Sequence, residues 1–297
     1  MAFASGARSR SFAQTFVALL VASFVAACTG SAPAPRPVSQ PTSEKYAAIV
    51  VDAGSGAMLY QVNANAQRYP ASLTKMMTLY LLFEAIDSGR VRLSDEIPVS
   101  DRARGQAPSK LGFKKGQTVD VESAIRALAV KSANDVAVAV GEFLAGSEEA
   151  FAVAMTGKAR ALGMSGTSFR NASGLPDEGQ RTTARDMAVL GMALQRRFPN
   201  YYRYFSATEF NFHGKSIRGH NELLSTVRGV DGIKTGYIRA SGFNIVTSVA
   251  RGGKRLVVVV MGGETARARN AHVQELIERY LPDGRGGRDA GNPLDLF

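Results

Sequence analysis

The sequence predicts an α+β fold in which one β-sheet is assembled from both ends of the chain. Strand-like patterns occupy Tyr46–Asp52 and Met58–Val62 and return only in the last third of the sequence, while helical periodicity fills the segment between them. Because strands and helices do not alternate one by one, we expect helices to cover a single sheet, and we exclude a doubly wound nucleotide-binding fold.

Turn signals and periodicity define the N-terminal and central elements. Gly54-Ser55-Gly56, between the first two strands, is typical of a hairpin. From Ala71 to Ile86, apolar residues recur at helical spacing on a broad face, which predicts a buried central helix. Further helices are predicted at Val121–Val130, Asp135–Leu144, Glu148–Leu162, Thr183–Arg196 and Ala266–Tyr280.

The late strands complete the predicted sheet. They are expected at Phe210–Ile217, Gly232–Thr235, Phe243–Ala250 and Arg255–Met261. The last two are separated by residues 251–254, a turn sequence with two glycines, and the apolar run Val257–Val260 is suited to a buried strand.

Composition excludes several classes of protein. The chain has 297 residues, 36 Lys and Arg against 25 Asp and Glu, a net charge of +11 and one Cys. A single Cys excludes a disulfide scaffold and a Cys-ligated zinc module, and the three His show no ligand spacing. The sequence has no phosphate-binding loop and no basic stripe interleaved with aromatic residues, so we expect no metal, no cofactor and no nucleic-acid partner.

The first 27 residues are typical of a secretory signal peptide. Arg8 and Arg10 precede an apolar run from Phe16 to Ala27 that is too short to span a bilayer comfortably. The end of this run, with Cys28, resembles the lipobox of bacterial lipoproteins, in which the Cys is lipidated; the alternative is ordinary cleavage after Ala27 with an incidental Cys. We therefore expect an exported protein of the periplasm or cell envelope, attached to a membrane through a lipid on Cys28.

Beyond the signal peptide, the chain divides into three parts. Residues 28–44 form a Pro-rich tether, because Pro33, Pro35, Pro37 and Pro41 favour an extended path. Residues 45–282 have the length of one α+β domain. Residues 283–297 form a polar, Gly-rich tail for which we expect no ordered structure.

Ser72-Leu73-Thr74-Lys75 opens the predicted central helix. Residues three apart share a helix face, so Ser72 and Lys75 point the same way. The positive end of the helix dipole favours an alkoxide on Ser72 and a neutral amine on Lys75. A serine with a desolvated lysine as its base is an activated nucleophile. The alternative interpretation is a capping serine beside a solvated lysine.

Two further patterns follow along the chain. Ser132-Ala133-Asn134 lies between two predicted helices, where Ser132 would relay a proton to a leaving group and Asn134 would hold a substrate amide. Its alternative role is to cap the following helix. Lys234-Thr235-Gly236 lies on a predicted strand, where a cation and a hydroxyl can bind a carboxylate and Gly leaves room for a substrate backbone.

The combination S-x-x-K, S-x-N and K-T-G, in this order, resembles the motif set of the low-molecular-weight penicillin-binding proteins of the D-alanyl-D-alanine carboxypeptidase family. The resemblance extends from about Tyr46 to Leu281. It includes Gly163-Met164, Phe169, Asn171, Ser173-Gly174-Leu175, Thr183–Ala188, His220-Asn221 and Val230–Tyr237. It implies an antiparallel sheet flanked by helices with a helical subregion, as in β-lactamases and transpeptidases, and makes residues 45–282 a D,D-peptidase catalytic domain.

The resemblance also implies roles for the motif residues. Ser72 would be the acylated nucleophile, Lys75 its base, and Ser132 and Asn134 the proton relay and the substrate anchor. Substrate binding is further assigned to Lys234, Thr235, Gly236, Tyr237 and Arg269. Among these, Lys234 and Thr235 would grip the terminal D-alanine, and the backbone N–H of Tyr237 would complete an oxyanion hole with that of Ser72. Arg269 would bind a carboxylate, and its alternative is a solvated helix charge.

The implied activity is removal of the last D-alanine from peptidoglycan stem peptides, with β-lactam antibiotics as acylating inhibitors. A D,D-endopeptidase and a non-catalytic penicillin-sensing or wall-binding lipoprotein stay open as alternatives, and the sequence does not determine the oligomeric state. A β-lactamase is disfavoured because Asp177 and Glu178 lie outside the required E-x-x-L-N pattern. Better-known members carry a C-terminal amphipathic helix for membrane attachment, and here we expect a lipid on Cys28 to replace it.

Overall fold

The structure is a computed structural model that describes residues 41–282. The predicted signal peptide, Cys28 and the tail at 283–297 lie outside the described residues, as does most of the Pro-rich tether. Within residues 41–282, no helix combines the length and the apolar character needed to cross a membrane.

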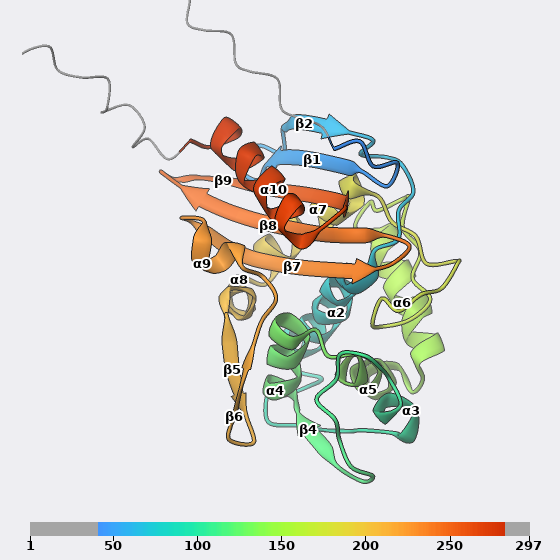
Figure 1. The fold of residues 1–297 in the computed structure, drawn as a ribbon. Helices are drawn as coiled ribbons and strands as arrows, with labels where there is room; N and C mark the ends of the chain where they lie inside the picture. The colour runs from blue at the N-terminus through green and yellow to red at the C-terminus, as the bar shows by residue number, and fades with distance from the viewer. Residues whose placement is uncertain (1–40, 283–297) are drawn as a thin grey trace, which may run out of the picture. The chain divides into compact units, whose positions relative to one another are not determined.

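One antiparallel sheet of five strands organises the domain, in the order β2-β1-β9-β8-β7 (Figure 1). The strands are β1 Ala47–Asp52, β2 Met58–Val62, β7 Val230–Ile238, β8 Gly242–Arg251 and β9 Lys254–Gly263. β1 pairs with β9 over its whole length, with Ala47 opposite Met261 and Asp52 opposite Leu256. The prediction of a single sheet built from both ends of the chain is therefore confirmed.

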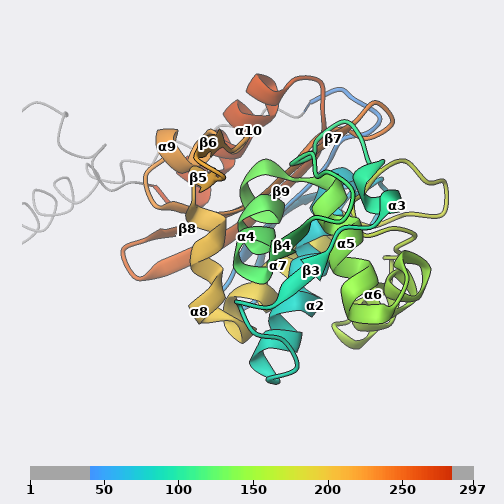
Figure 2. The ribbon, with the colours of Figure 1, turned by 90° about the horizontal axis from the view of Figure 1, so that it is seen from below.

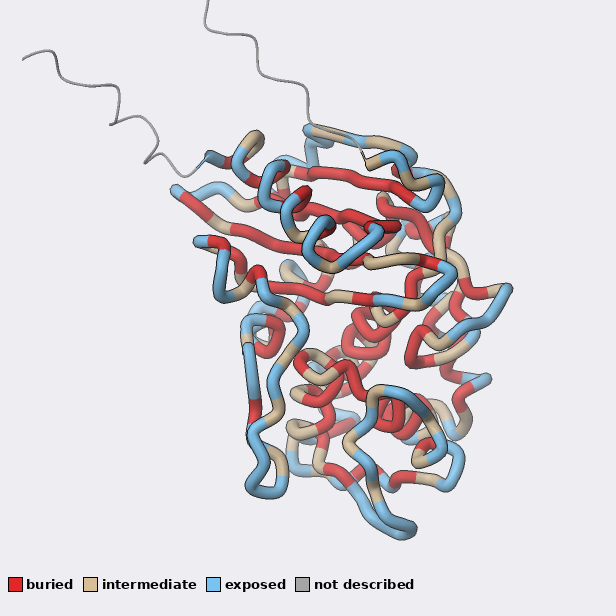
Figure 3. The backbone as a smooth tube through the Cα atoms, in the orientation of Figure 1, coloured by how far each residue is buried: buried red, intermediate tan, exposed pale blue. Residues whose placement is uncertain are grey.

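Helices on both faces explain why the central strands are apolar throughout. In β9, every residue from Leu256 to Gly263 is buried, because α10 (Ala266–Tyr280) lies on one face of the sheet and α7 (Ala184–Arg197) on the other (Figure 1). The edge strand β2 is more open, with Met58 and Leu59 exposed. Figure 3 shows this contrast between the buried middle strands and the exposed rim.

A helical region lies beside the sheet and surrounds the central helix α2 (Lys75–Asp87), which a 3-10 turn, η1 (Ala71–Thr74), introduces. Figure 2 shows this region from below. Its other elements are β3 Glu96–Pro98, α3 Asp101–Arg104, β4 Thr118–Asp120, α4 Val121–Arg126, the π-helical turn η2 Ala127–Lys131, α5 Asn134–Ala145 and α6 Glu148–Ala161. The α4 and α6 starts carry side-chain caps, with Asp120 accepting from Ser123 N and Ser147 from Ala150 N.

The predicted strand at Phe210–Ile217 is wrong, because the structure has a hairpin there. β5 (Glu209–Phe212) and β6 (Lys215–Arg218) pair with each other and belong to no larger sheet. His213 and Gly214 both have positive φ, at 49° and 76°, and two such residues give the turn that reverses a strand tightly. The short elements α8 (Pro199–Tyr202), η3 (Arg203–Ser206) and α9 (Leu223–Thr226) were also not predicted.

Candidate active site

Ser72 and Lys75 lie at the start of the central helix, as predicted. Lys75 is fully buried, and its Nζ lies 3.2 Å from Ser72 Oγ. The amine also donates to Asn134 Oδ1 (2.8 Å) and to the carbonyl of Ser173 (2.5 Å). Neither η1 nor α2 has a side-chain cap. The interpretation of Ser72 as a cap beside a solvated lysine is therefore wrong, and the pair has the geometry of a nucleophile and its base.

The second motif forms the turn between η2 and α5. Ser132 has a left-handed backbone, with φ of 62°, and its Oγ is buried without a hydrogen-bond partner among the described residues. The N-cap of α5 is Ala133, with no side-chain cap, so capping explains neither polar residue. Asn134 instead connects Lys75 to the neighbouring loop, where its Nδ2 donates to the carbonyl of Ala107 (2.9 Å).

The third motif lies on β7, an edge strand of the sheet. Lys234 is 2% exposed, and its Nζ donates to the carbonyl of Thr235. Gly236 lies directly against the nucleophile's turn, since a Cβ at this position would come within 3.0 Å of Ser72 N and 3.1 Å of Leu73 N. The absence of a side chain at Gly236 therefore allows the strand to approach the backbone of Ser72.

The three motifs meet at a cleft of about 400 Å³. Among the predicted site residues, those that line the cleft are Ser72, Ser132, Thr235, Gly236, Tyr237 and Arg269. Lys75, Asn134 and Lys234 are buried and do not line it. Residues from a helix start, a turn and a strand edge therefore share one open space, although more than 190 positions separate Ser72 from Arg269 in the sequence.

Two residues of the cleft differ in how firmly they are held. Tyr237 is 53% exposed and its ring packs on Phe243, with ring centroids 4.3 Å apart. Arg269 is 4% exposed and donates from Nη1 to the carbonyl of Asn244. The interpretation of Arg269 as a solvated helix charge is therefore wrong, and a fixed guanidinium borders the cleft.

Comparison with known proteins decides the family. A family model described as D-alanyl-D-alanine carboxypeptidase matches residues 35–265. The chain belongs to the D-alanyl-D-alanine carboxypeptidase family.

Relatives of this carboxypeptidase family are similar over most of the chain. D-alanyl-D-alanine carboxypeptidase DacA of Escherichia coli K12 is 39% identical over 236 residues, which are 77% of this chain and 59% of that protein. DacF of Bacillus subtilis strain 168 is 34% identical over 242 residues, or 79% and 61% of the two chains. The chain therefore spans about three fifths of the length of these curated relatives.

Solved structures agree with the family and the fold. Penicillin binding protein 5 from Haemophilus influenzae has a TM-score of 0.77 at 32% identity, covering 82% of this chain and 72% of that chain. Penicillin-binding protein D2 from Listeria monocytogenes, in its ampicillin-bound form, has a TM-score of 0.74 at 29% identity, covering 82% and 99%. The predicted fold class, an antiparallel sheet with flanking helices of the β-lactamase/transpeptidase type, is confirmed.

The electrostatics of this family member favour a neutral base. Burial lowers the pKa of Lys75 well below its ordinary value, and the positive charge of Lys234 lowers it further, against a smaller opposing effect of Asp135. Burial also lowers the pKa of Lys234 to about 7, with Arg269 as the second cause. A lowered pKa favours the neutral amine of Lys75, which is the form that can accept the proton of Ser72.

The pH dependence of acylation tests this environment. Because Lys75 must be neutral to act as a base, we expect the rate of Ser72 acylation by a β-lactam to rise with pH through an apparent pKa well below the free value of about 10.4. Removing the positive charge of Lys234 raises the pKa of Lys75, so in Lys234→Gln the rising limb should move to higher pH. Single-turnover acylation at saturating β-lactam gives the pH profile of the wild type and of Lys234→Gln. The same apparent pKa in both proteins would contradict the electrostatic coupling between Lys234 and Lys75.

The structure adds residues that the motifs did not reveal. The carbonyl of Ser173 accepts from Lys75, and Gly174, with φ of 87°, lies so close to η1 that a Cβ there would overlap the carbonyl of Ala71. Asn244 joins β8 to the residues before η1, because its Nδ2 donates to the carbonyl of Tyr69. His220, from the His220-Asn221 segment of the family resemblance, lines the cleft. A sequence motif is defined by side chains, so it does not reveal which main-chain carbonyl accepts a hydrogen bond. Ser173 and Gly174 nevertheless lie within a segment that supported the family resemblance.

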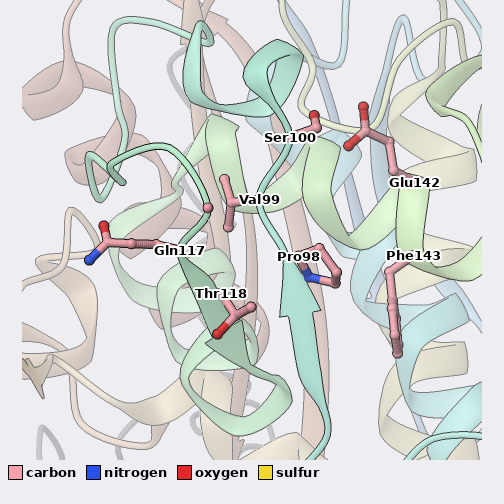
Figure 4. A pocket seen from close by; sticks show the side chains of 8 residues that line it. Pro98, Val99, Ser100, Gln117, Thr118, Glu142 and Phe143 are labelled. Carbon is pink, nitrogen blue, oxygen red and sulfur yellow. The ribbon is translucent and has the colours of Figure 1, made fainter.

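A second hollow, of about 300 Å³, lies away from the motifs (Figure 4). Pro98, Val99 and Phe143 give it apolar walls, and Glu142 lies at its rim. It shares no lining residue with the active-site cleft. Within residues 41–282, no group of three or more His, Cys, Asp or Glu is arranged to hold a metal ion. The second hollow is therefore a suitable place for control substitutions.

Proposed function

We propose that the chain is a serine-type D-Ala-D-Ala carboxypeptidase that removes the terminal D-alanine of peptidoglycan stem peptides through an acyl-enzyme on Ser72. The observation that carries this proposal is the fully buried Lys75 amine 3.2 Å from the Oγ of Ser72, which lines the same cleft as Ser132 and Thr235. Membership of the carboxypeptidase family supports the substrate class.

In the acylation step, neutral Lys75 accepts the proton of Ser72 Oγ as this oxygen attacks the carbonyl carbon between the two D-alanines. The backbone N–H groups of Ser72 and Tyr237 donate to the developing oxyanion. Ser132, whose buried hydroxyl has no hydrogen-bond partner among the described residues, passes its proton to the leaving amine, so that the C–N bond breaks and D-alanine departs. Lys75 then gives the proton that it took from Ser72 to Ser132, so the amine of Lys75 is neutral again before deacylation.

In the deacylation step, a water molecule gives its proton to the neutral amine and attacks the ester carbon. The ester C–O bond breaks, and Ser72 regains its proton, so the enzyme returns to its starting state. Asn134 serves both steps, because its Oδ1 accepts from Lys75 and fixes the amine within reach of Ser72.

Recognition of the leaving D-alanine depends on its carboxylate. The Thr235 hydroxyl and the Arg269 guanidinium lie at the same cleft, with the buried Lys234 adjacent to Thr235. A hydroxyl and a fixed guanidinium are suitable donors for a carboxylate. β-Lactams carry a reactive carbonyl and a carboxylate as well, and the ampicillin-bound Listeria structure is similar to this domain. We therefore propose that β-lactams acylate Ser72.

Covalent labelling and product release test the function together. We expect the wild-type protein to bind a fluorescent penicillin covalently and to release D-alanine from a peptide ending in D-Ala-D-Ala. Ser72→Ala should abolish both, since no other group supplies the attacking oxygen. Ser165→Ala, an exposed serine, is the matched control and should retain both activities. A label retained on Ser72→Ala would contradict the assignment of the nucleophile, and labelling without D-alanine release would favour a D,D-endopeptidase or a penicillin sensor.

We also propose that the protein is exported to the periplasm or cell envelope and is held at a membrane by a lipid on Cys28. The signal-like first 27 residues and the Cys that follows them support this location. The fluorescent penicillin reports it in cells, because the labelled band should sediment with membranes for the wild type and become soluble for Cys28→Ser. A Cys28→Ser band that still sediments would contradict lipid attachment.

A further inference from the structure

Arg269 is held from two sides before any substrate binds. Its Nη1 donates to the carbonyl of Asn244 (3.0 Å), while Nε and Nη2 both donate to Asn270 Oδ1 (3.1 and 2.7 Å). A guanidinium has five N–H hydrogens, so these contacts leave one hydrogen on Nη1 and one on Nη2. The orientation of the group, and the two donors left for a ligand, are therefore set by Asn244 and Asn270.

Asn270 connects this guanidinium to a carboxylate. Its Nδ2 donates to Glu222 Oε2 at 3.0 Å, while its Oδ1 faces Arg269. A neutral amide can offer an acceptor to a cation and a donor to an anion from the same side chain. Glu222 and Arg269 both line the cleft, yet within residues 41–282 the two charges form no ion pair of their own. The side-chain amide of Asn270 instead bridges Glu222 and Arg269 through hydrogen bonds to both.

Glu222 is also placed to compete with a ligand. It is exposed, so a ligand in the cleft can meet its carboxylate. Its charge interacts with Arg269, whose pKa burial lowers to about 10 and Glu222 raises in opposition. A second carboxylate near Arg269 therefore reduces the net attraction that Arg269 offers to an anionic ligand.

We infer that Asn270 is a positioning residue that aims Arg269 at the terminal carboxylate of the substrate and prevents Arg269 from pairing with Glu222. This inference rests on the proposed function, because the carboxylate is that of the leaving D-alanine. It predicts opposite effects for Asn270 and Glu222. Asn270 strengthens the preference of the cleft for a ligand with a free carboxylate over the corresponding amide, and Glu222 weakens that preference.

The test is a binding measurement that needs no turnover. In a Ser72→Ala background, titration calorimetry compares the Kd of an acyl-D-Ala-D-Ala peptide with that of the same peptide ending in D-alaninamide. Because hydrogen bonds to charged groups are the strong ones, Asn270→Ala should lower the preference for the acid by about tenfold, with the amide peptide unaffected. Glu222→Gln should raise the preference for the acid peptide by about threefold. The double variant should recover part of the preference that Asn270→Ala loses.

Matched controls and outcomes separate this inference from misfolding and from the function itself. Asn200→Ala and Glu142→Gln change exposed or half-buried residues away from the cleft and should leave the preference unchanged. An equal loss for the acid and amide peptides in Asn270→Ala, or a lower preference in Glu222→Gln, would overturn the inference. If the wild type releases D-alanine while the preferences stay constant, the inference fails alone; if the preferences shift but no D-alanine is released, the carboxypeptidase assignment fails alone.

Discussion

Replacing Lys75 by Met should slow acylation of Ser72 by about 10²–10⁴-fold, because a general base contributes rate factors of this order. Met has a similar length and no polar atom that can accept the proton. The amine it replaces is fully buried and lies 3.2 Å from Ser72 Oγ, and within residues 41–282 no other side chain is hydrogen-bonded to that oxygen. Rapid-mixing measurements with a fluorescent penicillin give the acylation rate directly.

Lys75→Arg distinguishes a base from a structural cation. Arginine keeps hydrogen-bond donors for Asn134 and Ser173 but does not give up its proton in proteins. We therefore expect Lys75→Arg to be as slow as Lys75→Met even where its thermal unfolding stays close to that of the wild type. An arginine variant that kept a tenth or more of the acylation rate would show that the charge of Lys75, rather than its ability to accept a proton, is what matters.

Gly174→Ala should cost the domain about 2–5 kcal/mol of stability and remove acylation. An alanine at φ of 87° costs about 1–2 kcal/mol by itself. Its Cβ would also overlap the backbone carbonyl of Ala71, and relieving that overlap requires the backbone to move, at about 1–3 kcal/mol more. The displaced backbone carries Ser72 on one side and the Ser173 carbonyl that holds Lys75 on the other, so the nucleophile and its base would separate.

Gly56→Ala is the matched control for this prediction. Gly56 has φ of 77°, but nothing lies within 4 Å of a Cβ built there. The control therefore measures the cost of the left-handed backbone without the overlap. Chemical denaturation of both variants gives the two free energies of unfolding, and similar values for the two would show that the contact between Gly174 and Ala71 does not constrain the site.

Local patterns were enough to predict most of the sheet and the central helix. The apolar run Val257–Val260 required a strand buried on both faces, and the helical spacing from Ala71 to Ile86 required a buried helix. The hairpin at Glu209–Arg218 was missed because the prediction treated Phe210–Ile217 as one strand, although Gly214 in its middle can take the positive φ that a tight turn needs. Sequence patterns report periodicity well, but they report an individual backbone conformation poorly.

The active-site residues also fall into those that sequence patterns reveal and those that they do not. Side chains that act through their own chemistry, such as Ser72, Lys75 and Lys234, were found because their spacing matches a motif. Supporting contacts were not, because the carbonyl of Ser173 could come from any residue type. The family resemblance selected Arg269 over Arg267, and burial separates the fixed guanidinium at the cleft from its exposed neighbour.

The pairing of β1 with β9 has a consequence for the order in which the domain can mature during synthesis. Among the strands of residues 41–282, β1 is made first, yet one of its two neighbours in the sheet, β9, is made last. Nascent chains that end before Lys254 hold Ser72 and Lys75 but leave β1 with an open edge, and such unpaired edges are prone to misassociation. Until β9 is available, the five-stranded sheet therefore cannot be completed.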